Sequence, residues 1–233
     1  MSNKIRIRLL SFLSIYTTLY VVLKFVGNMI PFFNMPNGGT IELELIAVFL
    51  ASYHMGWKVG GIVAILAWLV SFVLGAPMWF VHPMQILLDY VLPLLACGFA
   101  SILWPFGRLN RKSWLGVSVV VAVLACVGIL MSFPSGIATW IGALAVMAGV
   151  FAFNYWYMKR ETEFGIVLAM LLKYLFTVIS GAYYWADGVA AGSLPAWTFS
   201  LSYNLGYNLV TMVVCVIAVP ILMDRVLSQF PLK

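Results

Sequence analysis

Residues 9–26 read LLSFLSIYTTLYVVLKFV, an apolar stretch of 18 residues interrupted by a single charge at Lys24. A helix of about 20 apolar residues crosses a hydrocarbon core that is about 30 Å thick. The stretch is too long for the apolar core of a cleavable signal peptide, and no small-residue cleavage site follows it. We therefore expect a membrane-spanning helix here.

Similar apolar stretches recur along all 233 residues, of which 64% are hydrophobic and only 9% are charged. An ordinary soluble domain carries about 25% charged residues. Too little polar surface is therefore available to cover a water-facing globule, and lipid must be the solvent. We expect residues 1–233 to form a single transmembrane domain without a soluble appendage.

Apolar segments separated by turn-forming residues predict an all-α integral membrane protein, a bundle of roughly eight transmembrane helices. The predicted helices are Ile5–Val26, Ile41–Met55, Lys58–Leu74, Gln85–Trp104, Trp114–Phe133, Ala138–Met158, Phe164–Trp185 and Phe199–Met223. Links rich in Gly, Pro, Asn and Ser join them, and the last link is Gly192–Pro195. The second helix is short for a full span.

The basic residues occupy alternate links of this eight-helix arrangement. They are Lys4, Arg6, Arg8, Lys58, Arg108, Arg111, Lys112, Lys159, Arg160, Arg225 and Lys233. Because Lys and Arg favour cytoplasmic links, this pattern predicts a multi-pass protein with both termini in the cytoplasm. Topology thus accounts for the formal charge of +6 without a nucleic-acid partner.

Charged and polar side chains within the apolar segments are candidates for function, because charges are costly inside a bilayer. Asp89 shares a helix face with Gln85. A second face carries Lys173, Thr177, Gly181 and Trp185 at four-residue steps. A third carries Ser200, Asn204 and Asn208, with Tyr203 and Tyr207 beside them.

Acidic residues gather near the outer ends of the predicted helices. They are Glu42, Glu44, Asp89 and Asp187. An acidic outer site favours a cationic solute. Together with the polar faces, this distribution predicts a solute pocket in the outer half of the bundle.

Structural roles compete with these functional ones. Asp89 and Lys173 could neutralise each other, and Asn204 and Asn208 could serve as interhelical hydrogen-bond partners. Trp185 could belong, with Trp197, to an interfacial aromatic belt. Lys24 could reach the interface or pair with Glu42 or Glu44. At helix ends, His54 and His82 are expected to be interfacial, and the cysteines Cys97, Cys126 and Cys215 to be small buried hydrophobes.

The sequence contains no GxxxxGK[ST], HExxH or GxSxG motif and no carboxylate pair with a nearby base. We therefore expect neither an enzyme nor a metal or cofactor site. A protein that binds a solute but has no energy source of its own needs partners.

Several of these residues resemble the thiamine-specific substrate-binding (S) component of energy-coupling factor (ECF) transporters. The last two helices match it at Lys173–Phe176, Ser180–Gly181, Trp185, Phe199–Leu201 and Asn204. The second to fourth helices match it at Glu42, Gly56–Gly60, Trp68 and Gln85–Tyr90.

The resemblance implies a prokaryotic cell-membrane protein that binds a vitamin at an outward-facing, membrane-embedded site. It also implies docking on a transmembrane coupling protein and two ATPases. The family's ligand residues correspond to Trp68, Asp89, Tyr90, Lys173, Gly181, Trp185 and Asn204. Thiamine is a cation with a flat aminopyrimidine, which carboxylate and aromatic groups suit.

The sequence departs from the family at three positions of the site. Thr177 occupies the position of a family histidine, Phe199 that of a tyrosine and Gly38 that of a tryptophan. Asp89 occupies the position of a glutamate, which has the same charge. Thiamine, a thiamine precursor or a related heterocycle is therefore the expected ligand, with Glu42, Thr177 and Phe199 included in the site. An S component for another vitamin and a membrane scaffold without a solute remain as alternatives.

A further departure concerns the number of helices, because the family has six and eight are predicted here. The two additional helices form a hairpin at residues 114–158, inserted between the helices of Asp89 and Lys173. The resemblance also implies docking through small residues of the first helix. Ser11, Ser14 and Thr18 are the candidates, and the last two have small-xxx-small spacing.

Overall fold

The computed structural model describes residues 3–35, 38–103, 119, 122–123, 126–127, 136–157, 162–186 and 188–230. Within this part of the chain the regular structure is helical, apart from one antiparallel bridge between Asn34 and Thr40. The predicted all-α class is therefore confirmed. The predicted helix Trp114–Phe133 lies outside the described residues, except for the isolated positions above.

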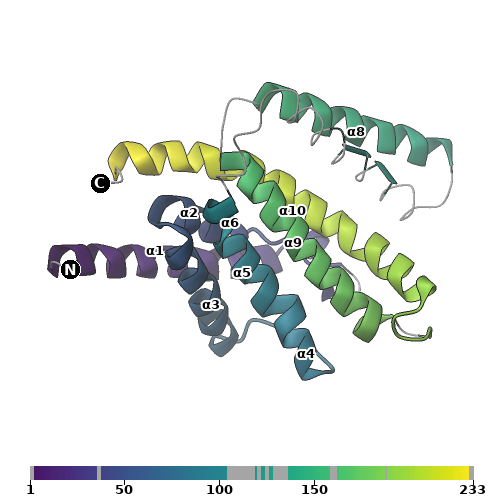
Figure 1. Cartoon of the computed structure of the whole chain (residues 1–233), viewed down its shortest axis with the longest axis horizontal. Helices are drawn as coiled ribbons and strands as arrows, with labels where there is room; N and C mark the ends of the chain where they lie inside the picture. The colour runs from purple at the N-terminus through teal and green to yellow at the C-terminus, as the bar shows by residue number, and fades with distance from the viewer. Residues whose placement is uncertain are drawn as a thin grey trace.

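The α-helices are α1 (Asn3–Asn28), α2 (Leu45–Met55), α3 (Trp57–Val73), α4 (Pro83–Gln85), α5 (Leu92–Gly98), α6 (Ala100–Leu103), α8 (Ile137–Tyr157), α9 (Thr162–Ser180) and α10 (Leu194–Gln229). A 3-10 helix, η1, covers Pro31–Phe33. Two π-helical segments, η3 (Ile86–Val91) and η5 (Gly181–Trp185), continue α4 and α9. Figure 1 shows the helices as a bundle, with α8 above α9 and α10 in this view.

Two predicted helix starts are wrong. The second helix begins at Leu45, because the N–H of Glu42 donates to the Thr211 hydroxyl of α10 (3.1 Å) and a turn at residues 43–44 follows. The last helix begins at Leu194, five residues before the prediction, because Ser193 caps it by accepting a hydrogen bond from the N–H of Ala196 (3.4 Å). Pro195 fits the first turn of a helix, where no N–H donor is needed.

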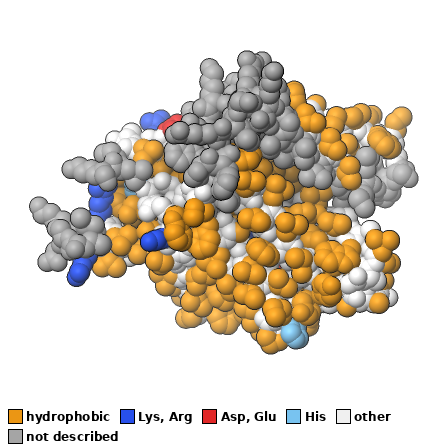
Figure 2. Space-filling model, viewed as in Figure 1, with side chains coloured by type: hydrophobic (Ala, Val, Ile, Leu, Met, Phe, Trp, Pro, Cys, Tyr) orange, Lys and Arg blue, Asp and Glu red, His pale blue; other side chains and the backbone are white. Residues whose placement is uncertain are grey.

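Within the described residues, three helical stretches are long and apolar enough to cross a membrane. They are Arg6–Asn28, Phe164–Trp185 and Leu194–Gln229. Four shorter apolar helices accompany them, at Leu45–Met55, Trp57–Val73, Pro83–Gly98 and Ile137–Gly149. Figure 2 shows apolar side chains over most of the visible face. The chain is a multi-pass membrane protein.

Helix α2 lies at the centre of the bundle, where α1, α3, α5 and α10 pack around it. Its residues 45–51 are at most 8% exposed, as expected for a helix that is apolar all round. Behind it, α3 and α5 touch through their backbones, since a Cβ atom on Gly60 would collide with the carbonyl of Gly98. Close approach of small residues is a main source of helix association in lipid.

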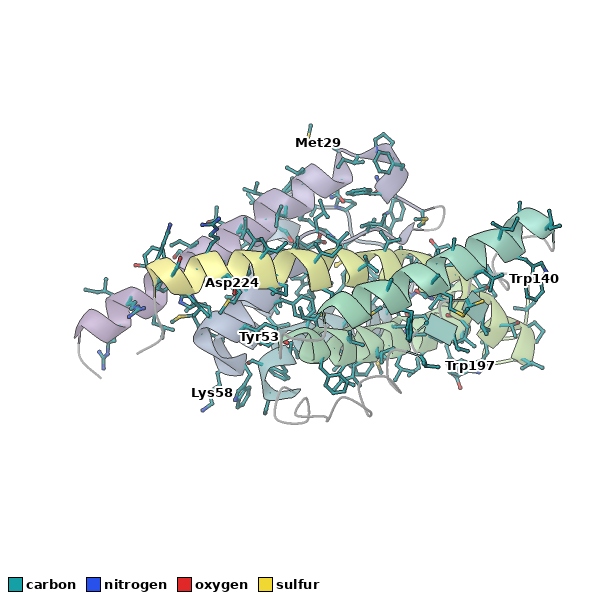
Figure 3. All side chains as sticks on the ribbon, turned by 90° about the horizontal axis from the view of Figure 1, so that it is seen from above. Met29, Tyr53, Lys58, Trp140, Trp197 and Asp224 are labelled. Carbon is teal, nitrogen blue, oxygen red and sulfur yellow. The ribbon has the colours of Figure 1, made fainter. Side chains whose placement is uncertain are left out.

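The start of α1 and the end of α10 lie at the same end of the bundle (Figure 1), here called the terminal end. The visible Lys and Arg side chains gather there (Figure 2). Lys58 and Asp224 lie toward this end, whereas Trp197 lies toward the opposite end (Figure 3). The arrangement agrees with an even number of membrane crossings.

The expectation that His54 is interfacial is wrong. Its side chain is fully buried at the terminal end, where Nδ1 lies 2.8 Å from the Tyr16 hydroxyl and Nε2 lies 3.1 Å from the Phe230 carbonyl oxygen. The ring of Phe12 packs edge-on against the imidazole. His54 therefore joins α1, α2 and the end of α10.

Candidate functional site: a polar cavity opposite the terminal end

A cavity of about 600 Å³ opens between the helix ends that lie away from the termini. Ligand pockets usually have volumes of about 300–1,000 Å³. The end of α1, the α1–α2 link, the α3–α4 link, η3, α9, η5 and the first half of α10 all contribute side chains. The lining residues are Lys24, Asn28, Asn34, Met35, Gly38, Gly39, Thr40, Glu42, Pro77, Trp79, Asp89, Tyr90, Lys173, Thr177, Gly181, Trp185, Phe199, Ser200, Tyr203, Asn204 and Tyr207.

The structure brings nine of the ten predicted site residues to this cavity. They are Glu42, Asp89, Tyr90, Lys173, Thr177, Gly181, Trp185, Phe199 and Asn204. The tenth, Trp68, borders a separate space of about 30 Å³ behind Tyr90. The rings of Trp68 and Tyr90 are stacked at 6.1 Å, so Trp68 supports the cavity wall from behind.

Asp89 is held by two neutral donors from η5 and the end of α9. Its Oδ2 accepts hydrogen bonds from the Ser180 hydroxyl (2.7 Å) and from the Trp185 indole N–H (3.3 Å). Asp89 and Trp185 both lie in π-helical segments, which often occur at functional sites. Neither donor carries a charge, so the carboxylate is oriented but not neutralised.

The other buried charges around the cavity form ion pairs. Lys173 Nζ lies 2.7 Å from Glu42 Oε2 and donates a hydrogen bond to Asn208 Oδ1 (2.7 Å). Lys24 Nζ lies 2.7 Å from Glu44 Oε1, which is one of the pairings that the sequence suggested. Lys173 thus pairs with Glu42 and not with Asp89, contrary to the structural pairing considered above.

Asn204 and Asn208 are buried and fully engaged. Asn204 Nδ2 donates to the Ser200 carbonyl (2.9 Å), and its Oδ1 accepts from the Tyr207 hydroxyl. Asn208 Nδ2 donates to the Asn204 carbonyl (2.8 Å), while its Oδ1 links α10 to Lys173 on α9. The interhelical role considered for the asparagines therefore applies to Asn208.

Gly181 contributes to the site by the absence of a side chain, which leaves room for α10. A Cβ atom at this position would collide with the Ser200 Oγ of α10. The Ser200 hydroxyl in turn donates to the Val178 carbonyl (2.7 Å) of α9. Glycine at position 181 therefore allows η5 and α10 to approach beside the cavity.

Two of the three positions at which the sequence departs from the resembled site, Thr177 and Phe199, differ in environment. The Thr177 hydroxyl donates to the Tyr174 carbonyl of its own helix (3.0 Å). Phe199 is 40% exposed, and its ring stacks on that of Tyr203 at 5.8 Å. The Tyr203 hydroxyl accepts a hydrogen bond from the N–H of Gly39 (3.0 Å), so α10 holds the α1–α2 link over the cavity.

The predicted site set omitted part of the lining. Tyr203 and Tyr207 were expected beside the polar face of the last helix but were not assigned to the site, although their four-residue steps from Phe199 place them on its face. Asn28, Asn34 and Trp79 gave no such signal, because they lie at a helix end or in links without periodicity.

The candidate docking residues lie on an exposed face of α1. Ser11, Ser14 and Thr18 are all exposed. The hydroxyl of Ser11 donates to the Ile7 carbonyl (2.9 Å), and that of Ser14 to the Leu10 carbonyl (3.0 Å). With their hydroxyls bonded within the helix, the serines present a small and weakly polar surface.

A multi-pass helical bundle with a polar, aromatic cavity between its helix ends is typical of membrane proteins that carry a small solute. Residues 13–230 match the family model described as "Thiamine transporter protein (Thia_YuaJ)". Thiamine transporter ThiT of Bacillus subtilis (strain 168) is 30% identical over 214 residues, which cover 90% of this chain and 87% of that relative. The chain belongs to the thiamine transporter family.

Family membership bears on two expectations. The resemblance to thiamine-specific transport proteins is confirmed over most of the chain. Since the family consists of transporters, the prediction that the chain is not an enzyme is confirmed as well.

Proposed function

We propose that this protein takes up thiamine as the substrate-binding S component of an ECF transporter in the cell membrane. The observation that carries the proposal is the environment of Asp89, a carboxylate held only by neutral donors in an aromatic cavity. Thiamine carries one positive charge and two flat rings. A charge-assisted contact to Asp89 and stacking on the aromatic wall suit both features.

The two buried Lys–Glu ion pairs favour selectivity for a cation over an anion. Lys173 and Lys24 are already paired with Glu42 and Glu44, so neither ammonium is available to attract an anion. Biotin and folate, which carry carboxylates, therefore fit the cavity poorly. Uncharged riboflavin gains nothing from the charge of Asp89, whereas a cation is attracted by it. The family match and the relative named as a thiamine transporter support the same ligand.

Energy for transport would come from partner proteins. The sequence contains no nucleotide-binding motif, so we assign ATP hydrolysis to two partner ATPases and release of the vitamin to a transmembrane coupling protein. The exposed face of α1 with Ser11, Ser14 and Thr18 is the proposed docking surface for that coupling protein. We treat residues 1–233 as one transmembrane domain with an inserted hairpin at residues 114–158.

Fluorescence quenching tests the proposal. Trp185 lies at the cavity with its indole N–H on Asp89, so a flat ring bound there should quench its emission. We expect saturable quenching by thiamine, or by its pyrimidine fragment, in the wild type and much less in Trp185→Phe. Because the chain has nine tryptophans, the matched control is Trp57→Phe, whose ring packs on Phe99 away from the cavity.

The ligand series separates the alternatives. Stronger quenching by the pyrimidine fragment than by thiamine would favour a precursor as the substrate, as the replacement of a histidine by Thr177 suggests. Quenching by riboflavin, biotin or folate would favour another vitamin. If no heterocycle quenches and none copurifies with the protein, a membrane scaffold replaces the transporter.

The proposed orientation makes a prediction about labelling from outside the cell. With both termini in the cytoplasm, single cysteines at Asn37, Ser135 and Ser193 should react with an impermeant maleimide in intact cells. A cysteine at Ser113 should react only after the cells are opened. Reaction of Ser113→Cys in intact cells would contradict the eight-helix topology.

A further inference from the structure

Trp79 lies in the α3–α4 link, at the mouth of the cavity, and was not among the predicted site residues. Its side chain is 63% exposed and lines the cavity. A Cβ atom built on Gly38 would lie 3.7 Å from Trp79 Cδ1, so the indole edge lies beside the α1–α2 link. One aromatic ring therefore lies between the two links that border the mouth.

The backbone of Trp79 is fixed from both sides by Tyr90. Its N–H donates to the Tyr90 hydroxyl (2.9 Å), and that hydroxyl donates to its carbonyl oxygen (3.2 Å). The Tyr90 ring is itself stacked on Trp68 with an interplanar angle of 27°. Because the single proton of the Tyr90 hydroxyl is used in this way, Tyr90 holds the link and has no proton left to donate to the ligand.

Tyr90 directly follows Asp89 in η3, so the residue that anchors Trp79 adjoins the residue that supplies the negative charge. None of the described aromatic rings stacks on Trp79, whereas Trp57 packs on Phe99 and Trp197 on Tyr183. An indole with a fixed backbone, a free face and a carboxylate nearby is well suited to a flat cation.

We propose that Trp79 stacks on the positively charged ring of the ligand and that Tyr90 is the positioning residue that holds Trp79 in place. The proposal rests on the function proposed above. It assigns the two rings of thiamine to different walls: the thiazolium to Trp79 at the mouth, and the aminopyrimidine to Trp185 in η5.

Calorimetric affinities for thiamine and for its pyrimidine fragment, which lacks the charged ring, test this assignment. In Trp79→Ala we expect thiamine to bind about two- to thirty-fold more weakly, as loss of a cation–π contact implies, with the affinity of the fragment unchanged. Trp79→Phe keeps an aromatic face and should lose less. Trp57→Phe is the matched control and should bind both ligands as the wild type does.

Tyr90→Phe tests the positioning role. This variant keeps the ring that stacks on Trp68 but removes both hydrogen bonds to the Trp79 backbone. We expect a several-fold loss of thiamine affinity together with more efficient quenching of Trp79 emission by acrylamide, which a merely structural role would not produce. The difference in quenching between Tyr90→Phe and Tyr90→Phe/Trp79→Phe isolates the emission of Trp79.

Failure of the roles proposed for Trp79 and Tyr90 can be distinguished from failure of the proposed function. If the wild type binds thiamine and Trp79→Ala binds it equally well, Trp79 does not contact the ligand. Equal losses for thiamine and the fragment would overturn the assignment to the charged ring. Unchanged affinity and quenching in Tyr90→Phe would overturn the positioning role, while absence of thiamine binding in the wild type would overturn the proposed function.

Discussion

Lys173→Met is expected to lower the stability of the ligand-free protein by about 3 kcal/mol, because it breaks a buried ion pair. The Lys173 side chain is 3% exposed and that of Glu42 is 20% exposed. Removal of the ammonium leaves the Glu42 carboxylate uncompensated and Asn208 Oδ1 without its donor. The lower end of the usual 3–5 kcal/mol range applies because water still reaches Glu42. The midpoint of thermal unfolding in mild detergent measures the loss.

Two further variants identify the cause. Glu42→Gln/Lys173→Met removes both charges and should be more stable than Lys173→Met alone, since no charge is then buried without a partner. Lys58→Met removes an exposed lysine near the terminal end and should unfold like the wild type. A stability of Lys173→Met equal to that of the wild type would show that the ion pair contributes nothing.

Asp89→Asn is expected to weaken the binding of thiamine about ten- to a hundred-fold. The substitution preserves the shape of the side chain and removes its charge, and a hydrogen bond to a charged group contributes about 1.5–3 kcal/mol. Ser180 and Trp185 both donate to Oδ2, and the amide oxygen of asparagine can take its place, so the fold should be retained. Equilibrium binding of thiamine to the purified variant measures the effect.

Asp224→Asn provides the matched control, because it removes a carboxylate toward the terminal end, far along α10 from the cavity. It should bind thiamine like the wild type. A neutral analogue of thiamine should lose little affinity in Asp89→Asn if the charge is what matters. Unchanged affinity of Asp89→Asn for every cationic vitamin tested would make Asp89 a structural residue.

Helical periodicity was sufficient to predict the part of the cavity wall that α9 and η5 supply. Lys173, Thr177 and Gly181 recur at four-residue steps, and the structure places all three at the cavity. The π-helical geometry of η5 could not be predicted, because it departs from the 3.6-residue period, although its Trp185 lines the cavity as expected. The same applies to η3, where Asp89 and Tyr90 lie.

Contacts between side chains that are distant in the sequence could be predicted only in part. The sequence indicated that Lys24 could pair with Glu42 or Glu44, but it could not choose between them, because that choice depends on how α1 packs against the start of α2. Trp79 lies in a link, where no periodicity reveals the direction of a side chain. Its position depends on the hydroxyl of Tyr90, eleven residues later in the chain.

The environment of Asp89 has an electrical consequence. Among the described ionisable groups around the cavity, Lys24 offsets Glu44 and Lys173 offsets Glu42, which leaves one net negative charge on Asp89. With a monovalent cation bound, the loaded cavity is neutral. Moving one elementary charge through 100 mV is worth about 2.3 kcal/mol, so the membrane voltage would act on the empty cavity and leave the loaded one unaffected.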